Sequence, residues 1–253
     1  MSVLQRNQSG ENENTAAQWH SIYTVGGVAT VIVLIGIVLD FILGSVTGGN
    51  LSALPQTAVD RFAQFQENRL LGLYHLDLLN TVNQILLIPA YFALYAVHRK
   101  ANNAYAQLAL IIYLVATTIF VTTNTALPML ELSNKYAAAG TESQKTLLAA
   151  AGEAMLARGE HGSLGVFIGF LLPNLAGLIM SFVMLRARIF HKINSYLGIA
   201  GNILMTIYIV LVTFAPGVKG MATAFAAPGG LLLMAWMIMF TIRLFQLGNL
   251  KND

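Results

Sequence analysis

Six long apolar stretches dominate the pattern along the chain. They lie at about residues 22–46, 70–97, 106–127, 164–185, 195–214 and 224–245. An α-helix rises about 1.5 Å per residue and the hydrocarbon core of a bilayer is about 30 Å thick, so roughly 20 apolar residues are enough to cross it. The sequence therefore predicts an all-α, polytopic membrane protein, a bundle of six transmembrane helices formed by residues 21–248.

The two ends of the chain are more polar than these stretches. Residues 1–20 lack the basic region and short apolar run of a cleavable signal peptide. We expect residues 1–20 to form a disordered tail and residues 249–253 to form a second, shorter one. Trp19 would lie near the lipid headgroups, where aromatic side chains are favoured.

Basic residues are concentrated in alternate loops. The loops after the second and fourth stretches contain five basic residues and no acidic one: Arg99, Lys100, Arg186, Arg188 and Lys192. The other three loops contain as many acidic residues as basic ones. The positive-inside rule then predicts that both termini are cytoplasmic and that the protein spans the plasma membrane several times.

The loops on the opposite side are predicted to contain amphipathic helices. The run from Thr141 to Gln144 has the pattern of a capping box, which starts a helix. The apolar face after it would comprise Leu147, Leu148, Ala151, Met155 and Leu156, with Lys145, Glu153 and Glu160 away from that face. Val59, Phe62 and Phe65 form a weaker version in the first loop. These helices either cover the ends of the spans on the outer surface or act as a lid over a cavity.

Two carboxylates interrupt the apolar stretches at a similar depth. Asp40 precedes the outer end of the first stretch by about six residues, and Asp77 is the eighth residue of the second. Both would lie roughly 10 Å below the outer edge of the bilayer core. Ionised groups are costly at that depth. We therefore expect the two carboxylates to face a common space, where they share a proton or bind a cation.

Further polar side chains extend this feature into a layer across the spans. The ligand-binding candidates are Asp40, Asp77, Asn80, Gln84, Thr117, Asn124, Asn174 and Thr206. Two interpretations stay open. The amides and hydroxyls hold the helices together by interhelical hydrogen bonds, or they line a ligand or ion cavity that opens to the outside.

The composition excludes several kinds of chemistry. The chain has no cysteine, which excludes thiolate metal ligands and thiol nucleophiles. His75 and His161 could join Asp40 and Asp77 in a zinc site by ligand type, but no HExxH motif supports a metal, and no cofactor is predicted. The net charge of +3 is small. It is better explained by the distribution of basic residues between the two sides of a membrane than by binding to nucleic acid.

Small residues on the fourth span indicate close helix packing. Gly165 and Gly169 form a G-x-x-x-G pattern, which lets another helix approach and is a candidate face for oligomer formation. The three-span halves show no convincing internal repeat, which would have been typical of a transporter.

Several local runs of sequence are similar to those of a known family. The relevant runs are Met184–Arg186, Arg188–Phe190, Tyr196–Asn202, Ile242–Gly248 and the Asp77-containing span that ends in Leu94–Tyr95. Together they resemble a widespread prokaryotic family of six-span membrane proteins catalogued as a domain of unknown function. This resemblance implies the six-helix fold and brings no activity, cofactor or catalytic residue.

Three functions are compatible with these observations. The first is a membrane protein that binds or moves a small amphipathic or cationic ligand through an outward-facing polar cavity. The second is a membrane-embedded enzyme that acts on lipid with Asp40, Asp77 and His75. The third is a structural or partner-binding subunit. Membrane lipid and a small molecule are the expected partners.

Overall fold

The computed structural model describes residues 3–46 and 55–249. These residues form helices and short 3₁₀ turns and no strand. Among them, six helical stretches are long and apolar enough to cross a membrane, which confirms the all-α six-span fold. The elements are α1 (Val3–Val46), α2 (Ala58–Glu67), α3 (Arg69–His75), α4 (Leu78–Leu86), α5 (Ile88–His98), α6 (Asn103–Thr123), α7 (Ala126–Ala138), α8 (Glu142–Gly159), η2 (Leu164–Val166), α9 (Phe167–Ala187), α10 (Lys192–Phe214), η3 (Pro216–Val218) and α11 (Lys219–Gly248).

The spans form a ring in which each packs against the next one along the chain. The order is α1, α4 with α5, α6, α9, α10 and α11, and α11 packs against α1 to close the ring. The interior is filled by large side chains such as Met180 and Phe240. The rings of Tyr91 and Tyr113 stack there with their centroids 3.8 Å apart.

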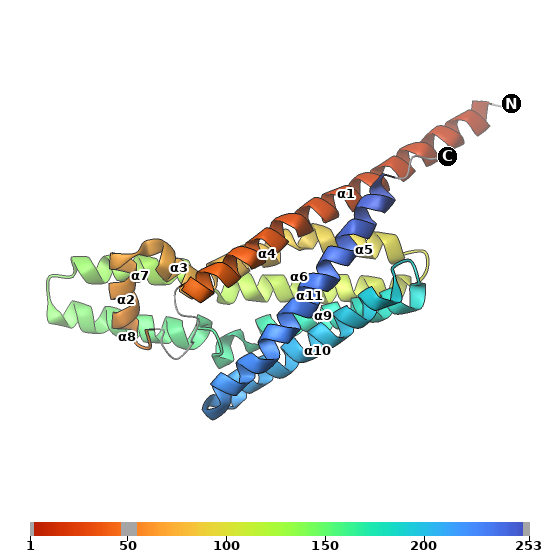
Figure 1. The fold of residues 1–253 in the computed structure, drawn as a ribbon. Coiled ribbons are helices and arrows are strands. Elements are labelled where there is room, and N and C mark those ends of the chain that lie inside the picture. Colours follow the sequence, from red (N-terminus) through yellow and green to blue (C-terminus); the bar gives the residue numbers. More distant parts are fainter. Residues whose placement is uncertain (1–2, 47–54, 250–253) are drawn as a thin grey trace.

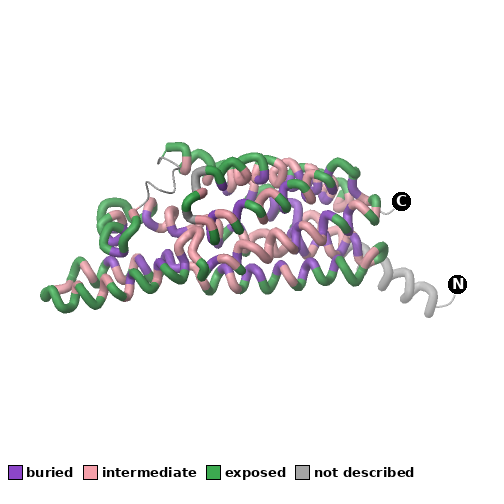
Figure 2. The backbone as a smooth tube through the Cα atoms, turned by 90° about the horizontal axis from the view of Figure 1, so that it is seen from below, coloured by how far each residue is buried: buried purple, intermediate pink, exposed green. Residues whose placement is uncertain are grey.

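The faces turned away from the ring are apolar, as lipid requires. On α1 the exposed side chains include Val25, Val28, Ile32 and Ile35, which recur at spacings of three and four residues. Figure 2 shows buried and exposed positions alternating along the helices in this way. A helix that is apolar on both its packed and its exposed face is typical of a membrane span.

Two of the predicted helix boundaries differ in the structure. α1 begins at Val3, so the polar segment before Trp19 continues the first span as a helix and is not the disordered tail that we expected. The span nucleates the helix, and each added residue then gains one backbone hydrogen bond. Residues 250–253 of the predicted C-terminal tail lie outside the described residues.

The second predicted span is interrupted. α3 ends at His75 and α4 begins at Leu78, so Asp77 lies in a break between helices and not in the middle of a continuous one. Leu87 separates α4 from α5, and Pro89 occupies the first turn of α5, where proline is well tolerated.

Helices α2, α3, α7 and α8 form a separate layer at one end of the bundle, which we call the cap (Figure 1). Its core is built from α2, α7 and α8 and includes Phe62, Phe65, Met129 and Leu156. Both expected helices are therefore present, α2 with one clearly apolar face and α8 without a sharp division into apolar and polar faces. Leu147, however, is 70% exposed, so the predicted apolar face of α8 does not extend that far.

The capping box at the start of α8 is confirmed with one change. The side chain of Thr141 accepts a hydrogen bond from the backbone N–H of Gln144. The side chain of Gln144 accepts from the N–H of Gly140, one residue before the position expected of a capping box. The loop and the helix are thus fastened together at the tip of the cap.

Candidate functional site

The site is built around the break between α3 and α4. Asp77 has a φ of 61° and a ψ of 24°, which is the left-handed conformation. Aspartate adopts this conformation more readily than most residues because its short side chain bonds locally. Leu76 is fully buried beside it, and the amide of Asn124 donates to the Leu76 carbonyl at 2.8 Å. Asn124, which lies between α6 and α7, therefore holds the break between α3 and α4 in place through this hydrogen bond.

The carboxylate of Asp77 is fully engaged in hydrogen bonds. Oδ2 lies 3.0 Å from Nδ1 of His161, and Oδ1 accepts from the amide of Asn80 at 2.9 Å. The backbone carbonyl of Asp77 accepts from the hydroxyl of Thr81. The side chains of Asp77 and His161 are 15% and 17% exposed, so the pair is largely buried.

A tight turn after α8 places His161 beside Asp77. Gly162 has a φ of 82°, which glycine adopts without steric cost. The ring of His161 packs edge-on against Phe170, with the centroids 4.9 Å apart. Its Nε2 lies 2.7 Å from the phenol oxygen of Tyr208 on α10. One imidazole thus joins the α3–α4 break, the α8–α9 connection and α10.

The electrostatics of this pair favour its charged form. Asp77 and His161 lie just before the spans that begin at Leu78 and Leu164. Burial by itself raises the pKa of Asp77, but the charge of His161 and the hydrogen bonds that Asp77 accepts hold its pKa below the usual value. Burial by itself lowers the pKa of His161, but the neighbouring Asp77 raises it overall. Both pKa shifts favour the charged forms of the pair, a carboxylate on Asp77 and an imidazolium on His161.

A second carboxylate lies near this pair. Asp40, near the end of α1, is half-buried, and its backbone carbonyl accepts a hydrogen bond from Tyr74 at 3.0 Å. The charge of Asp40 acts on both Asp77 and His161. Among the described residues no cationic side chain forms an ion pair with Asp40. The structure therefore brings the two predicted acids into one electrostatic cluster, while the direct partner of Asp77 is His161.

The cap contributes one more ion pair to the cluster. Arg61 of α2 is 1% exposed and donates to Glu160 at 2.9 Å. Glu160, which we expected to lie away from the packed face of α8, is thus half-buried next to His161. Arg61 also acts on the charge of Asp77. With every group ionised, three carboxylates and two cations leave the cluster with a net charge of minus one.

The other predicted polar residues lie away from this cluster. The phenol of Tyr113 donates to both the side chain and the backbone carbonyl of Gln84 at 2.8 Å. Thr117 is buried on α6. Asn174 and Thr206 each donate to a carbonyl one turn earlier in their own helix. Of the polar layer, Asp77, Asn80 and Asn124 meet at the break, and Asp40 interacts with Asp77 through its charge.

Histidine 75 faces a different environment. Its Nδ1 lies 3.0 Å from the amide nitrogen of Gln64 on α2. The zinc hypothesis grouped His75 and His161 with the two acids, and of the two histidines the structure pairs only His161 with Asp77. Among the described residues, no group of three or more histidine and acidic side chains is arranged to hold a metal ion.

Sequence reasoning missed the roles of Tyr208 and Arg61. Tyr208 lies in an apolar stretch, where an interfacial or core role is the ordinary one. Arg61 belongs to a loop in which an exposed arginine is normal. The only available signal was that Arg61 shares a helix with Phe62 and Phe65, whose burial places Arg61 close to the core of the cap.

The glycine face of the fourth span is used inside the chain. A side chain at Gly169 would contact the backbone of Phe120 on α6, and one at Gly165 would collide with the carbonyl of Arg158. The oligomer expected through this face stays a prediction, since the contacts seen here are intramolecular.

Comparison with known proteins gives one match. Residues 25–242 match a family described as "Domain of unknown function (DUF4386)". No curated protein and no solved structure is similar enough to this chain to count as a match. The matched segment covers four spans completely, most of the first and the last, the cap and every residue of the cluster.

Proposed function

Since this chain belongs to the DUF4386 family of unknown function, we propose from its site that it binds a small cationic or amphipathic ligand at the cap end of the membrane bundle. The observation that carries the proposal is the cluster of Asp40, Asp77 and His161, in which one carboxylate has no cationic partner among the described residues. A net negative charge in a poorly hydrated site is neutralised by a proton or by a cation.

Asp40 is the best candidate to contact the ligand. Each carboxylate oxygen of Asp77 already has a hydrogen-bond partner, His161 or Asn80. Asp40 is half-buried among exposed apolar neighbours such as Leu39 and Phe41. A ligand with a positive group and an apolar body would satisfy both features of this surface.

The cap offers a way to couple binding to movement. Arg61 and Glu160 join α2 to the segment that holds His161. A shift of α2 would therefore change the charge near the Asp77–His161 pair. Transport of a ligand across the membrane requires such coupling between a polar site and a segment that moves over it.

Equilibrium binding of a lipophilic cation tests this proposal. Purified protein in phosphatidylcholine nanodiscs is titrated with radiolabelled tetraphenylphosphonium. Asp40→Asn, which keeps the shape of the side chain and removes its charge, should weaken binding by at least about tenfold, or ~1.4 kcal/mol. Glu67→Gln removes an exposed carboxylate from the cap and should leave the affinity unchanged. Equal affinity in all three proteins would overturn the proposal.

Uptake experiments then separate binding from transport. Vesicles that contain the wild-type protein should accumulate the cation faster than empty vesicles if the protein moves its ligand. If binding of the cation depends on Asp40 but its uptake is no faster than in empty vesicles, the protein binds the cation without transporting it.

One observation supports a second candidate, an enzyme. Asp77, His161 and Tyr208 form a chain in which a carboxylate orients an imidazole and the second ring nitrogen meets a hydroxyl. This order is used for acid–base catalysis. Here the imidazole would be His161 and not His75. Incubation with phospholipid vesicles, followed by mass spectrometry of the lipids, tests it: products lost in Asp77→Asn would favour the enzyme.

A further inference from the structure

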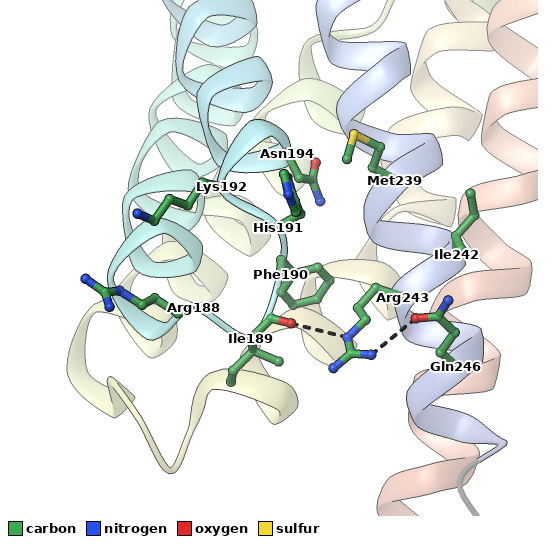
Figure 3. A pocket seen from close by; sticks show the side chains of 10 residues that line it. All are labelled: Arg188, Ile189, Phe190, His191, Lys192, Asn194, Met239, Ile242, Arg243 and Gln246. Atoms are coloured by element: carbon green, nitrogen blue, oxygen red, sulfur yellow. Dashed lines mark hydrogen bonds between the residues drawn. The ribbon is translucent and has the colours of Figure 1, made fainter.

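A cavity of about 600 Å³ lies at the end of the bundle opposite the cap. It is bounded by the connection between α9 and α10 on one side and by α11 on the other, as Figure 3 shows. Its lining includes the cations Arg188, Lys192 and Arg243 and no carboxylate. Three cations in one hollow without a neutralising acid point to an anionic ligand.

Arg243 is held in a fixed position in this cavity. Its Nε donates to the carbonyl of Ile189 and its Nη1 donates to the side chain of Gln246, both at 3.2 Å (Figure 3). Among the described residues, Nη2 has no hydrogen-bond partner. A guanidinium that is already oriented by neutral acceptors keeps its full charge for a phosphate oxygen.

The turn that supplies Arg188 is unusual. Arg188 has a φ of 57°, a left-handed conformation that glycine or asparagine normally occupies at the end of a helix. Glycine would adopt the conformation of this turn with less strain than arginine. Three residues later His191 caps α10, and Lys192 and Asn194 of its first turn line the cavity. The N-terminus of a long helix adds a further attraction for an anion.

The cavity is open to the apolar surface of the bundle. Ile242 lines it and is 54% exposed, and Ile238, one turn earlier on α11, is also exposed. Ile193 is exposed on the neighbouring α10. An apolar stripe that leads from the lipid-facing surface into a basic hollow fits a molecule with a phosphate and acyl chains. A soluble anion would use the cations alone.

We propose that this cavity is a binding site for the phosphate group of an anionic phospholipid in the leaflet at this end of the protein. Arg243 contacts the phosphate, Arg188 and Lys192 add positive charge on the other side of the α9–α10 connection, and the acyl chains lie along Ile238 and Ile242. The site is independent of the cluster at the cap end, so the two proposals stand or fall separately.

Native mass spectrometry of the full-length protein tests this site. Detergent-solubilised protein is titrated with phosphatidylglycerol and, separately, with phosphatidylcholine. We expect preferential binding of phosphatidylglycerol and about a fivefold loss of affinity in Arg188→Gly and in Arg243→Gln. Arg188→Gly is informative because glycine suits the turn, so a loss there reflects charge and not misfolding.

Arg186→Gln provides the matched control. Arg186 lies at the same end of the bundle but lines a different cavity, and its replacement should leave lipid affinity unchanged. Unchanged affinity in Arg188→Gly and Arg243→Gln would overturn the site, as would an equal loss in all three variants. If inorganic phosphate bound at these arginines and the two lipids bound equally, the ligand would be a soluble anion and the lipid assignment would be wrong.

Discussion

His161 is the residue on which the cap-end cluster depends. Its imidazole contacts Asp77, which lies 84 positions earlier in the sequence, and Tyr208, which lies 47 positions later. Removal of one member of a buried ion pair leaves the charge of the other uncompensated. We expect His161→Gln to lower the free energy of unfolding by about 3–5 kcal/mol. His20→Gln, at the opposite end of the bundle, should change it by less than about 0.5 kcal/mol. Denaturant unfolding in detergent measures both, and equal effects would contradict this role.

The same pair predicts a pH dependence of stability. The pKa of His161 is raised, so its contribution is complete below the ordinary histidine pKa of about 6.5 and is lost as pH rises through the raised value. The pKa of Asp77 is lowered, so its contribution is complete above about pH 3.9 and is lost as pH falls through the lowered value. The excess Tm of the wild type over Asp77→Asn should be greatest between these limits. A pH-independent excess would rule out the ion pair.

At the scale of single residues the sequence predicted part of the cluster. A carboxylate in an apolar stretch is costly enough to be noticed without a structure, and this identified Asp40 and Asp77. The pairing with His161 could not be deduced, because it depends on a left-handed residue and a glycine turn. Neither feature changes the hydrophobic periodicity from which helices are predicted.

At the scale of elements, Asn124 connects two helix breaks. It donates to the carbonyl of Leu76 and accepts from the N–H of Ala126. Asn124→Ala should cost about 1–3 kcal/mol, because the buried carbonyl loses its donor. It should also increase hydrogen exchange in residues 72–80. Asn174→Ala is the matched control, since Asn174 bonds only to its own helix. Faster exchange in both variants, or in neither, would argue against the link.

The helices themselves were predicted more accurately than their interruptions. Length and hydropathy are sufficient to define a span, because the bilayer thickness sets one scale for all six. The division of the second span between α3, α4 and α5 is decided by tertiary contacts at Leu76 and Asn124. Contacts between residues 48 positions apart leave no local signal.

At the scale of the whole molecule, the orientation in the membrane is open to a direct test. The chain has no cysteine, so single cysteines can be introduced without a background. Charge bias predicts that a cysteine at Ser143, which is exposed in the cap, reacts with an impermeant maleimide in intact cells. A cysteine at Asn102, beside the basic loop, should react only after the membrane is opened. The reverse pattern would invert the predicted topology.

The two ends of the molecule differ in chemistry as well as in topology. The cap end contains the cluster, which has a net charge of minus one when every group is ionised, and the opposite end contains a cavity lined by Arg188 and Arg243. This asymmetry was visible in the loop charges. The packing of the cap over Asp77 was not, because it arises from contacts among α2, α7 and α8.

The central claim is that the cluster of Asp40, Asp77 and His161 balances one uncompensated negative charge with a proton or a cation. Isothermal titration of tetraphenylphosphonium in two buffers with different ionisation enthalpies counts the protons released per cation bound. We expect release of up to about one proton by the wild type and no measurable binding at the same concentrations by Asp40→Asn. Cation binding without proton release, and with the same affinity in Asp40→Asn, would contradict the account.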